Sequence, residues 1–114
     1  WSPLASGALT GKYLEGVPDG SRASLKGYEW LRRHMIESAR GQERMQKVSK
    51  YIGIAKDHDL DPVKLAIAWC LLNINVSTVI LGASNIKQLE DNLNSLDYLK
   101  KFENRELVKS LDNL

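Results

Sequence analysis

The sequence lacks several features that would place it outside ordinary globular proteins. Cys70 is the only cysteine among its 114 residues, and no run of about 20 apolar residues occurs. A single cysteine excludes an intrachain disulfide, and without a long apolar run we expect no direct insertion into a membrane. Cys70 lies within the apolar run 65–72, which favours a small buried hydrophobe over a reactive thiol. These absences predict a cytoplasmic protein for which membrane association would need a partner.

A strong excess of charge is also missing. The net charge is +2, from 16 Lys and Arg against 14 Asp and Glu, which is too small to indicate a nucleic-acid surface. Basic residues do gather between positions 32 and 50, but Glu37 and Glu43 interrupt them and no aromatic residues are interleaved for base stacking. We expect a solvated helix face there and no nucleic-acid partner. The composition, 43% hydrophobic and 26% charged, is that of a folded globular chain.

The first half of the chain predicts a long loop followed by helices. Residues 1–28 are rich in Gly, Ser and Pro, and long loops of this kind in compact domains tend to be functional. Apolar residues then recur at offsets of three and four over 37–58, which predicts an amphipathic helix. Asp61 followed by Pro62 marks the start of a second helix that reaches about Asn73 and is buried on most sides.

The second half predicts a strand, a tight turn and a capped helix. Residues 76–81 are mostly apolar and β-branched, as in a strand covered on both faces in a parallel sheet. Gly82 ends this run, and a helix with apolar residues at 86, 89 and 93 follows. A last amphipathic helix is expected over 104–113, with Leu107 facing inward. The pattern predicts an α/β fragment.

A predicted strand followed by a turn at Gly82 and Ser84 and then by a helix is an arrangement that can bind an anion. Backbone N–H groups and the positive end of the helix dipole meet there, Ser84 adds a hydroxyl, and Gln88 lies about one turn further on. The alternative is structural, since Gly82 can simply turn the chain while Ser84 or Asn85 caps the helix. The spacing alone favours this structural interpretation.

Several motifs resemble the aldo-keto reductases, and together they cover almost the whole chain. They are Trp-Ser-Pro-Leu-Ala-Ser-Gly at 1–7, Thr-Gly-Lys-Tyr at 10–13, Ala-Ile-Ala-Trp at 66–69 and Val-Ile-Leu-Gly-Ala-Ser-Asn at 79–85. The stretch Ser-Arg-Ala-Ser-Leu-Lys-Gly-Tyr at 21–28 is similar to the branch formed by the β-subunits of voltage-gated potassium channels. The resemblance implies that residues 1–114 are the C-terminal part of one (β/α)₈ barrel domain. A whole barrel needs about 250 residues, and the chain begins with Trp1 rather than Met, so we expect a fragment.

The resemblance also implies a site for NADPH. It places one aromatic ring on the nicotinamide, backbone and hydroxyl groups along the pyrophosphate, basic side chains on the phosphates, and a last group around the adenosine and its 2′-phosphate. In that order the implied residues are Trp1; Ser2, Pro3, Leu4 and Ser6; Lys12 and Arg22; and Gly82, Ser84, Gln88, Asp91 and Asn92. Position 6 is Ser where the channel subunits carry Cys, and position 91 is Asp where they carry Glu.

Simpler roles compete with these assignments. Trp1 can be a core aromatic, and Lys12 and Arg22 can be solvated loop charges. His34 and His58, the only histidines, lie in charged stretches and are expected to be exposed rather than catalytic.

The resemblance places the catalytic Tyr, Lys and Asp of the family in earlier strands, so we assign no catalytic residue to this chain. The intact protein is expected to be either a regulatory subunit on the cytoplasmic domain of a potassium channel α-subunit, as a homotetramer, or an ordinary carbonyl reductase. By itself the chain is expected to be inactive and to fold poorly, because part of a barrel leaves apolar faces uncovered.

Overall fold

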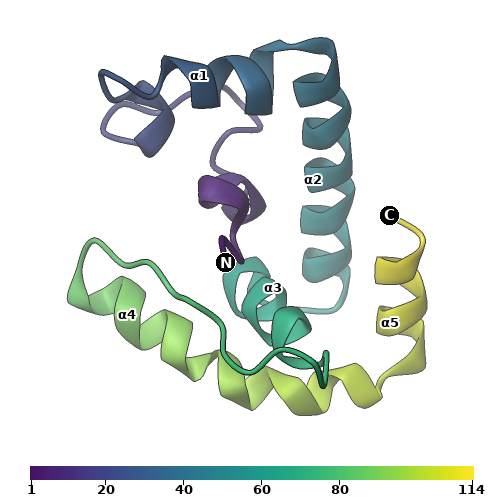
Figure 1. Cartoon of the computed structure of the whole chain (residues 1–114). Helices are drawn as coiled ribbons and strands as arrows, with labels where there is room; N and C mark the ends of the chain where they lie inside the picture. Colours follow the sequence, from purple (N-terminus) through teal and green to yellow (C-terminus); the bar gives the residue numbers. More distant parts are fainter.

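The computed structural model describes residues 1–114, and its regular structure is entirely helical (Figure 1). The α-helices are α1 (Glu29–Arg32), α2 (Ala39–Asp57), α3 (Pro62–Leu71), α4 (Ile86–Leu93) and α5 (Arg105–Asp112). The 3₁₀ segments are η1 (Ala5–Thr10), η2 (Arg22–Ser24) and η4 (Asn94–Glu103), and η3 (Arg33–Glu37) is a π-helical turn. The expected loop over 1–28 therefore contains two short 3₁₀ segments joined by turns.

The predicted strand over residues 76–81 is wrong for this structure, and with it the α/β class is not confirmed. The segment has no regular structure and runs beside α4 to the turn before that helix (Figure 1). It is also not covered on both faces, since Ile80 is 65% exposed. A parallel strand needs a neighbouring strand to pair with its backbone N–H and C=O groups. No segment of this chain provides one, so the β-branched pattern has no sheet to join.

The predicted helices α2 and α3 are confirmed, and the sequence explains where they start. Ser38 precedes α2, and its hydroxyl oxygen accepts from the Gly41 N–H at 3.0 Å. Asp61 precedes α3, and its carboxylate accepts from the N–H groups of Val63 and Lys64 at 2.8 and 3.1 Å. Each cap satisfies N–H groups that the helix itself leaves free.

Helix α3 lies in the middle of the molecule, between the N-terminal segment and the C-terminal helices. Its Leu65 and Ala68 are fully buried, as expected for a helix covered on most sides. One core cluster joins η1, α1 and α2 around Tyr13 and Leu31. The other joins α2, α3 and α5 around Tyr51 and Leu65. Burial of these apolar side chains is the main force that holds the helices together.

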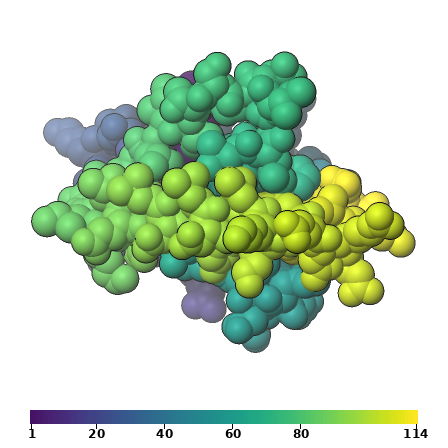
Figure 2. All heavy atoms as spheres, turned by 90° about the horizontal axis from the view of Figure 1, so that it is seen from below, coloured from purple at the N-terminus to yellow at the C-terminus, as the bar shows by residue number.

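Helices α4 and α5 and the η4 segment between them form a continuous band across one face of the molecule (Figure 2). Leu107 of α5 is 1% exposed, so its predicted inward position is confirmed. The apolar side of α4 is different, because Ile86 is 75% exposed and Leu93 is 54% exposed. No helix in the molecule is both long enough and apolar enough to cross a membrane.

Gly41 allows the π-helical turn η3 to pack closely against the start of α2. A Cβ atom at this position would lie 2.8 Å from the backbone N of Ile36. Backbone atoms cannot rotate away as a flexible side chain does, so only glycine permits this approach. The contact sets how α1 and the preceding segment 21–28 are held against the rest of the molecule.

Candidate functional site

The turn before α4 brings together the residues that predict an anion site. Asn85 is the N-cap, and its Oδ1 accepts from the Gln88 N–H at 2.9 Å. The N–H and the Oγ of Ser84 both donate to Oε1 of Gln88, each at 2.9 Å. The structural alternative is therefore correct in part, because Asn85 does cap the helix. Ser84 and Gln88 nevertheless lie together at its positive end.

Gly82 and Asn92 complete this turn. The Asn92 amide Nδ2 donates to the Gly82 carbonyl at 3.1 Å, and Asn92 is only 4% exposed. The space around Gly82 is open, since a Cβ built there would meet no atom within 4 Å. The N–H of Ala83 makes no hydrogen bond within the chain. The turn therefore offers a free backbone donor at a place that a ligand can approach.

Asp91 is held by lysines rather than free to meet a ligand. Its carboxylate lies 3.2 Å from the Lys87 ammonium and 4.0 Å from that of Lys64. Both pairs are partly exposed, and such pairs contribute little to stability. They do balance the negative charge of Asp91. The Asp91 carboxylate is therefore less repulsive to an anion than an unpaired carboxylate would be.

These donors fit an anionic phosphate oxygen. The positive end of the α4 dipole, the free Ala83 N–H and the Ser84 hydroxyl all favour negative charge. The residues do not fit a metal ion, because no group of three or more His, Cys, Asp or Glu side chains comes together anywhere in the molecule. The turn therefore offers hydrogen-bond donors, and no metal-ligating cluster, to a ligand.

The N-terminal residues form a second group, and no hydrogen bond joins it to the first. Trp1 is 97% exposed, so the alternative that it is a core aromatic is wrong for this structure. Leu4 packs against the core cluster of Tyr51 and Leu65. The backbone is left-handed at Ser2 and Ser6, with φ of 53° and 57°, a conformation that few non-glycine residues adopt.

Trp1 and Pro3 line a cavity of about 290 Å³ against the end of α3 and the segment that follows it. Its remaining lining residues are Trp69, Cys70, Asn73, Val76, Thr78 and Val79. Cys70 is half-buried here rather than fully buried as expected. Of the residues assigned to the cofactor, Trp1 and Pro3 line this cavity, whereas Lys12, Arg22 and the residues of the turn before α4 do not.

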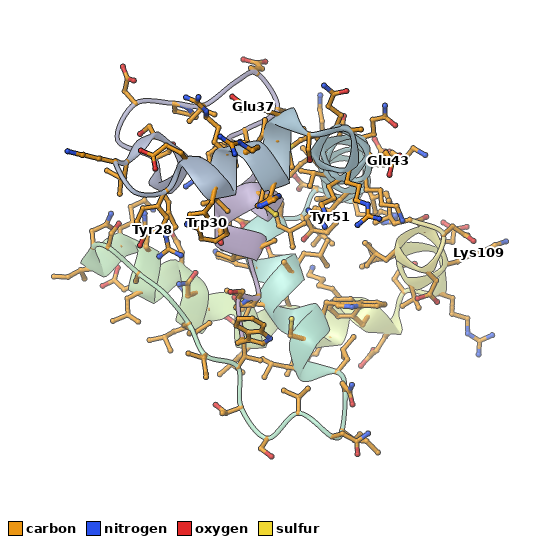
Figure 3. All side chains as sticks on the ribbon, turned by 45° about the horizontal axis from the view of Figure 1, so that its top comes forward. Tyr28, Trp30, Glu37, Glu43, Tyr51 and Lys109 are labelled. Carbon is orange, nitrogen blue, oxygen red and sulfur yellow. The ribbon has the colours of Figure 1, made fainter.

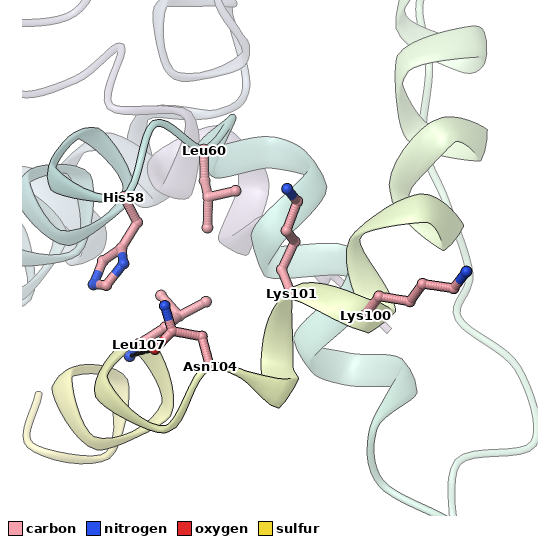
Figure 4. Close-up of a pocket in the computed structure, with 6 residues that line it drawn as sticks. All are labelled: His58, Leu60, Lys100, Lys101, Asn104 and Leu107. Carbon is pink, nitrogen blue, oxygen red and sulfur yellow. Dashed lines mark hydrogen bonds between the residues drawn. The ribbon is translucent and has the colours of Figure 1, made fainter.

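Another cavity, of about 250 Å³, lies between the α2–α3 connection and α5. His58 and the start of α5 border it, while the Lys100 side chain extends away from it (Figure 4). None of the residues assigned to the cofactor takes part. His34 is exposed as expected, whereas His58 is half-buried at this cavity.

Lys12 and Arg22 lie over tyrosine rings and form no ion pair. The Lys12 ammonium is 5.2 Å from the centre of the Tyr13 ring, and the Arg22 guanidinium is 6.0 Å from that of Tyr28. Both side chains are exposed, and neither bonds to the turn before α4. Their charges are therefore not neutralised by any carboxylate and remain available to an anion. The structure does not bring them to the phosphate turn.

Aromatic rings are exposed around Arg22. Tyr28 and Trp30 lie at the outer end of α1 with ring centres 6.4 Å apart (Figure 3), and Trp30 is 55% exposed. The Gly27 N–H donates to the Glu29 carboxylate at 3.0 Å, which holds the pKa of Glu29 below its usual range. This exposed aromatic pair was not identified as a site from the sequence.

The chain matches the model of the aldo/keto reductase family over residues 1–113. It therefore belongs to that family. The match fits a part of a (β/α)₈ barrel, and proteins of this family generally use nicotinamide dinucleotides. Of the residues assigned by resemblance, the structure assembles Gly82, Ser84, Gln88, Asp91 and Asn92 in one place.

Two features of this turn were missed by reasoning from the sequence. One is the free Ala83 N–H, and the other is the bond between Asn92 and Gly82. Neither has a local signal, because Gly82 and Asn92 are ten positions apart and come together only through the reversal of the chain at the turn. The Lys64 contribution to Asp91 likewise depends on α3 packing beside α4.

Proposed function

We propose that the intact protein binds NADPH and that this chain supplies the part of the site that holds the adenosine phosphate. The observation that carries this proposal is the turn before α4, where Ser84, the Ala83 N–H and the helix dipole present donors to an anion. Membership of the aldo/keto reductase family supports a nicotinamide dinucleotide as the ligand.

Each remaining residue has a proposed task in the same site. The exposed Trp1 ring stacks on the nicotinamide. Ser2, Pro3, Leu4 and Ser6 follow the pyrophosphate. Lys12 and Arg22 supply positive charge, Arg as a planar fork of donors and Lys as a mobile point charge. When bound, the cofactor supplies a hydride for the reduction of a carbonyl group. This chain orients the cofactor and contributes no catalytic residue.

A nucleotide titration of the intact protein tests the proposal. We expect saturable binding of NADPH, followed by tryptophan fluorescence, and at least tenfold weaker binding of NADH because it lacks the 2′-phosphate. Absence of NADPH binding would overturn the proposal. Equal affinity for the two nucleotides would overturn the assignment of the phosphate turn.

The proposed partner is the cytoplasmic domain of a voltage-gated potassium channel α-subunit, with the intact protein acting as a homotetrameric regulatory subunit. The support is the resemblance of residues 21–28 to the channel β-subunits. These residues are largely exposed beside Tyr28 and Trp30, as an interaction surface requires. The second candidate is a carbonyl reductase without a channel partner, which family membership supports equally.

Co-purification separates the two candidates. The intact protein is mixed with the channel cytoplasmic domain and passed over a sizing column, and its reduction of simple aldehydes is measured in parallel. A stable complex with slow turnover supports the channel subunit. No complex together with fast aldehyde turnover would identify the ordinary reductase instead.

A further inference from the structure

The cavity between the α2–α3 connection and α5 has a basic lining that the proposed nucleotide site does not use. Its volume is about 250 Å³, and its lining residues are His58, Leu60, Lys100, Lys101, Asn104 and Leu107. Leu107 belongs to the core cluster of Tyr51 and Leu65, so the cavity lies directly against the core. The lining contains three basic side chains and no carboxylate. It therefore favours a ligand with negative charge.

The polar groups of this lining are free to donate. The side chains of His58 and Lys101 make no hydrogen bond within the chain, and neither takes part in any of the three ion pairs of the molecule. Oδ1 of Asn104 accepts from the N–H groups of Glu106 and Leu107 at 3.0 and 3.3 Å. These bonds cap α5 and use the amide oxygen, whereas Nδ2 of the same amide branches away from them and has no partner.

The donors come from three separate segments of the chain. His58 follows α2, Lys101 belongs to η4, and Asn104 precedes α5. The His58 ring borders the cavity on one side and the Lys101 side chain extends along another, whereas the neighbouring Lys100 extends away (Figure 4). An ammonium, an imidazole and an amide that approach from different sides suit a tetrahedral anion, since such an anion accepts on several oxygens at once.

Four carboxylates lie close by in the sequence without lining the cavity. They are exposed and flank His58 and Asn104 along the chain, at Asp57, Asp59, Glu103 and Glu106. They lower the positive potential around the cavity, so we expect a ligand to bind with modest rather than high affinity.

We propose that this cavity is a separate anion site, which takes the phosphate group of a small molecule through His58, Lys101 and Asn104. A water molecule takes up about 30 Å³, so a cavity of about 250 Å³ has space for roughly eight. One phosphate group needs less, which leaves space for a small organic part beside Leu60. The site shares no residue with the turn before α4 and does not depend on the binding of NADPH.

Nuclear magnetic resonance of the histidine rings tests the site in the intact protein. Inorganic phosphate and glycerol phosphate are titrated separately at constant pH and ionic strength, and His58→Gln and His34→Gln variants assign the two signals. We expect a saturable shift of the His58 signal at millimolar phosphate. The exposed His34 does not line the cavity and should not respond. Tighter binding of glycerol phosphate would identify an organic phosphate as the ligand, and tighter binding of inorganic phosphate the free ion. No shift with either, or the same shift with chloride, would overturn the proposal.

Two adjacent lysines provide a matched pair of variants. Lys101→Met keeps the length of the side chain but removes its charge and its donors, so it should weaken phosphate binding at His58 about tenfold. Lys100→Met makes the same change on the side chain that extends away (Figure 4), and it should weaken binding less than about twofold because its charge is screened. Equal effects of the two variants would overturn the proposal. If the intact protein binds no NADPH, the proposed function fails while the His58 response still decides this site.

Discussion

Ser84 and Asp91 differ in how free their side chains are to meet a ligand. Ser84 keeps an exposed hydroxyl whose present acceptor, Gln88, is a neutral amide. Asp91 is engaged by two lysines. The partners of each side chain are therefore more informative than its place in or before α4, and Ser84 is the better candidate for direct contact with the nucleotide.

Removal of the Ser84 hydroxyl should weaken NADPH binding. A hydrogen bond to a charged group contributes about 1.5 kcal/mol or more, so Ser84→Ala is expected to raise the Kd of the intact protein for NADPH by about tenfold. Ser77→Ala is the control, because Ser77 is exposed in the irregular segment and its hydroxyl has no partner. A Ser84→Ala affinity equal to that of the control would exclude the hydroxyl from the site.

Tyr51 should make stability depend on pH in the alkaline range. Burial raises the pKa of its phenol above the ordinary value of 10.0, with the Asp61 carboxylate adding to the effect, and its hydroxyl donates to the Pro62 carbonyl. The neutral phenol is thus favoured in the folded state. Below pH 10 the folded and unfolded states are equally protonated at this group; above it, the unfolded state ionises first and stability is lost.

Urea unfolding between pH 8 and pH 11 measures this effect. The contribution of Tyr51 to the free energy of unfolding should not change with pH up to about pH 10. Above that pH it should fall by roughly 1.4 kcal/mol per pH unit. Tyr51→Phe should be less stable at neutral pH through the lost hydrogen bond but should have a shallower alkaline slope. Parallel curves for the two proteins would contradict the assignment.

Among the secondary-structure elements, the helices could be predicted from neighbouring residues in the sequence, and a strand could not. The starts of α2 and α3 were predictable because Ser38 and Asp61 act on N–H groups only three residues away. The strand predicted at 76–81 does not form, because a strand depends on partners that the local sequence does not contain. In the same way, the phosphate turn was predictable as a capped helix start, whereas the bond from Asn92 to Gly82 was not.

Two glycines of α2 give a paired prediction about how elements pack. A Cβ at Gly41 would lie 2.8 Å from backbone N of Ile36, whereas one at Gly53 would meet nothing within 4 Å. Gly41→Ala should therefore destabilise the intact protein by about 1–3 kcal/mol through overpacking. Gly53→Ala should stabilise it by roughly 0.5–1 kcal/mol, because alanine loses less backbone freedom in a helix.

Equilibrium unfolding in urea compares the two variants. If both glycines responded in the same direction, the close approach of η3 to α2 would not be the cause. Gly41→Ala should also weaken any ligand contact made by Arg22, because η3 and α1 connect that residue to α2.

At the scale of the whole molecule, much apolar surface faces solvent. Along α4 and η4 the exposed fractions are 75% for Ile86, 45% for Leu89, 54% for Leu93 and 60% for Leu96. Contiguous apolar surface of this kind is usually covered in a stable protein. Family membership is consistent with coverage by other parts of a barrel.

The isolated 114-residue chain is therefore expected to self-associate and to lack a cooperative thermal transition. Sedimentation velocity should show a weight-average coefficient that rises with concentration. The double variant Leu93→Ser, Leu96→Ser should reduce this rise, while Leu25→Ser, equally exposed but on a distant loop, should not. A monomeric chain with a sharp transition would show that this surface needs no cover.

The hydrogen bonds between Ser84 and Gln88 limit how tightly an anion can bind. Oε1 of Gln88 already accepts from both the N–H and the Oγ of Ser84, so it competes with a ligand for those two donors. An incoming phosphate replaces one acceptor with another rather than filling empty bonding capacity. The binding free energy is then the difference between the hydrogen bonds that Ser84 makes to the ligand and those that it makes to Gln88. A doubly charged phosphate accepts more strongly than the amide and can bind, whereas a neutral acceptor no stronger than the amide gains nothing.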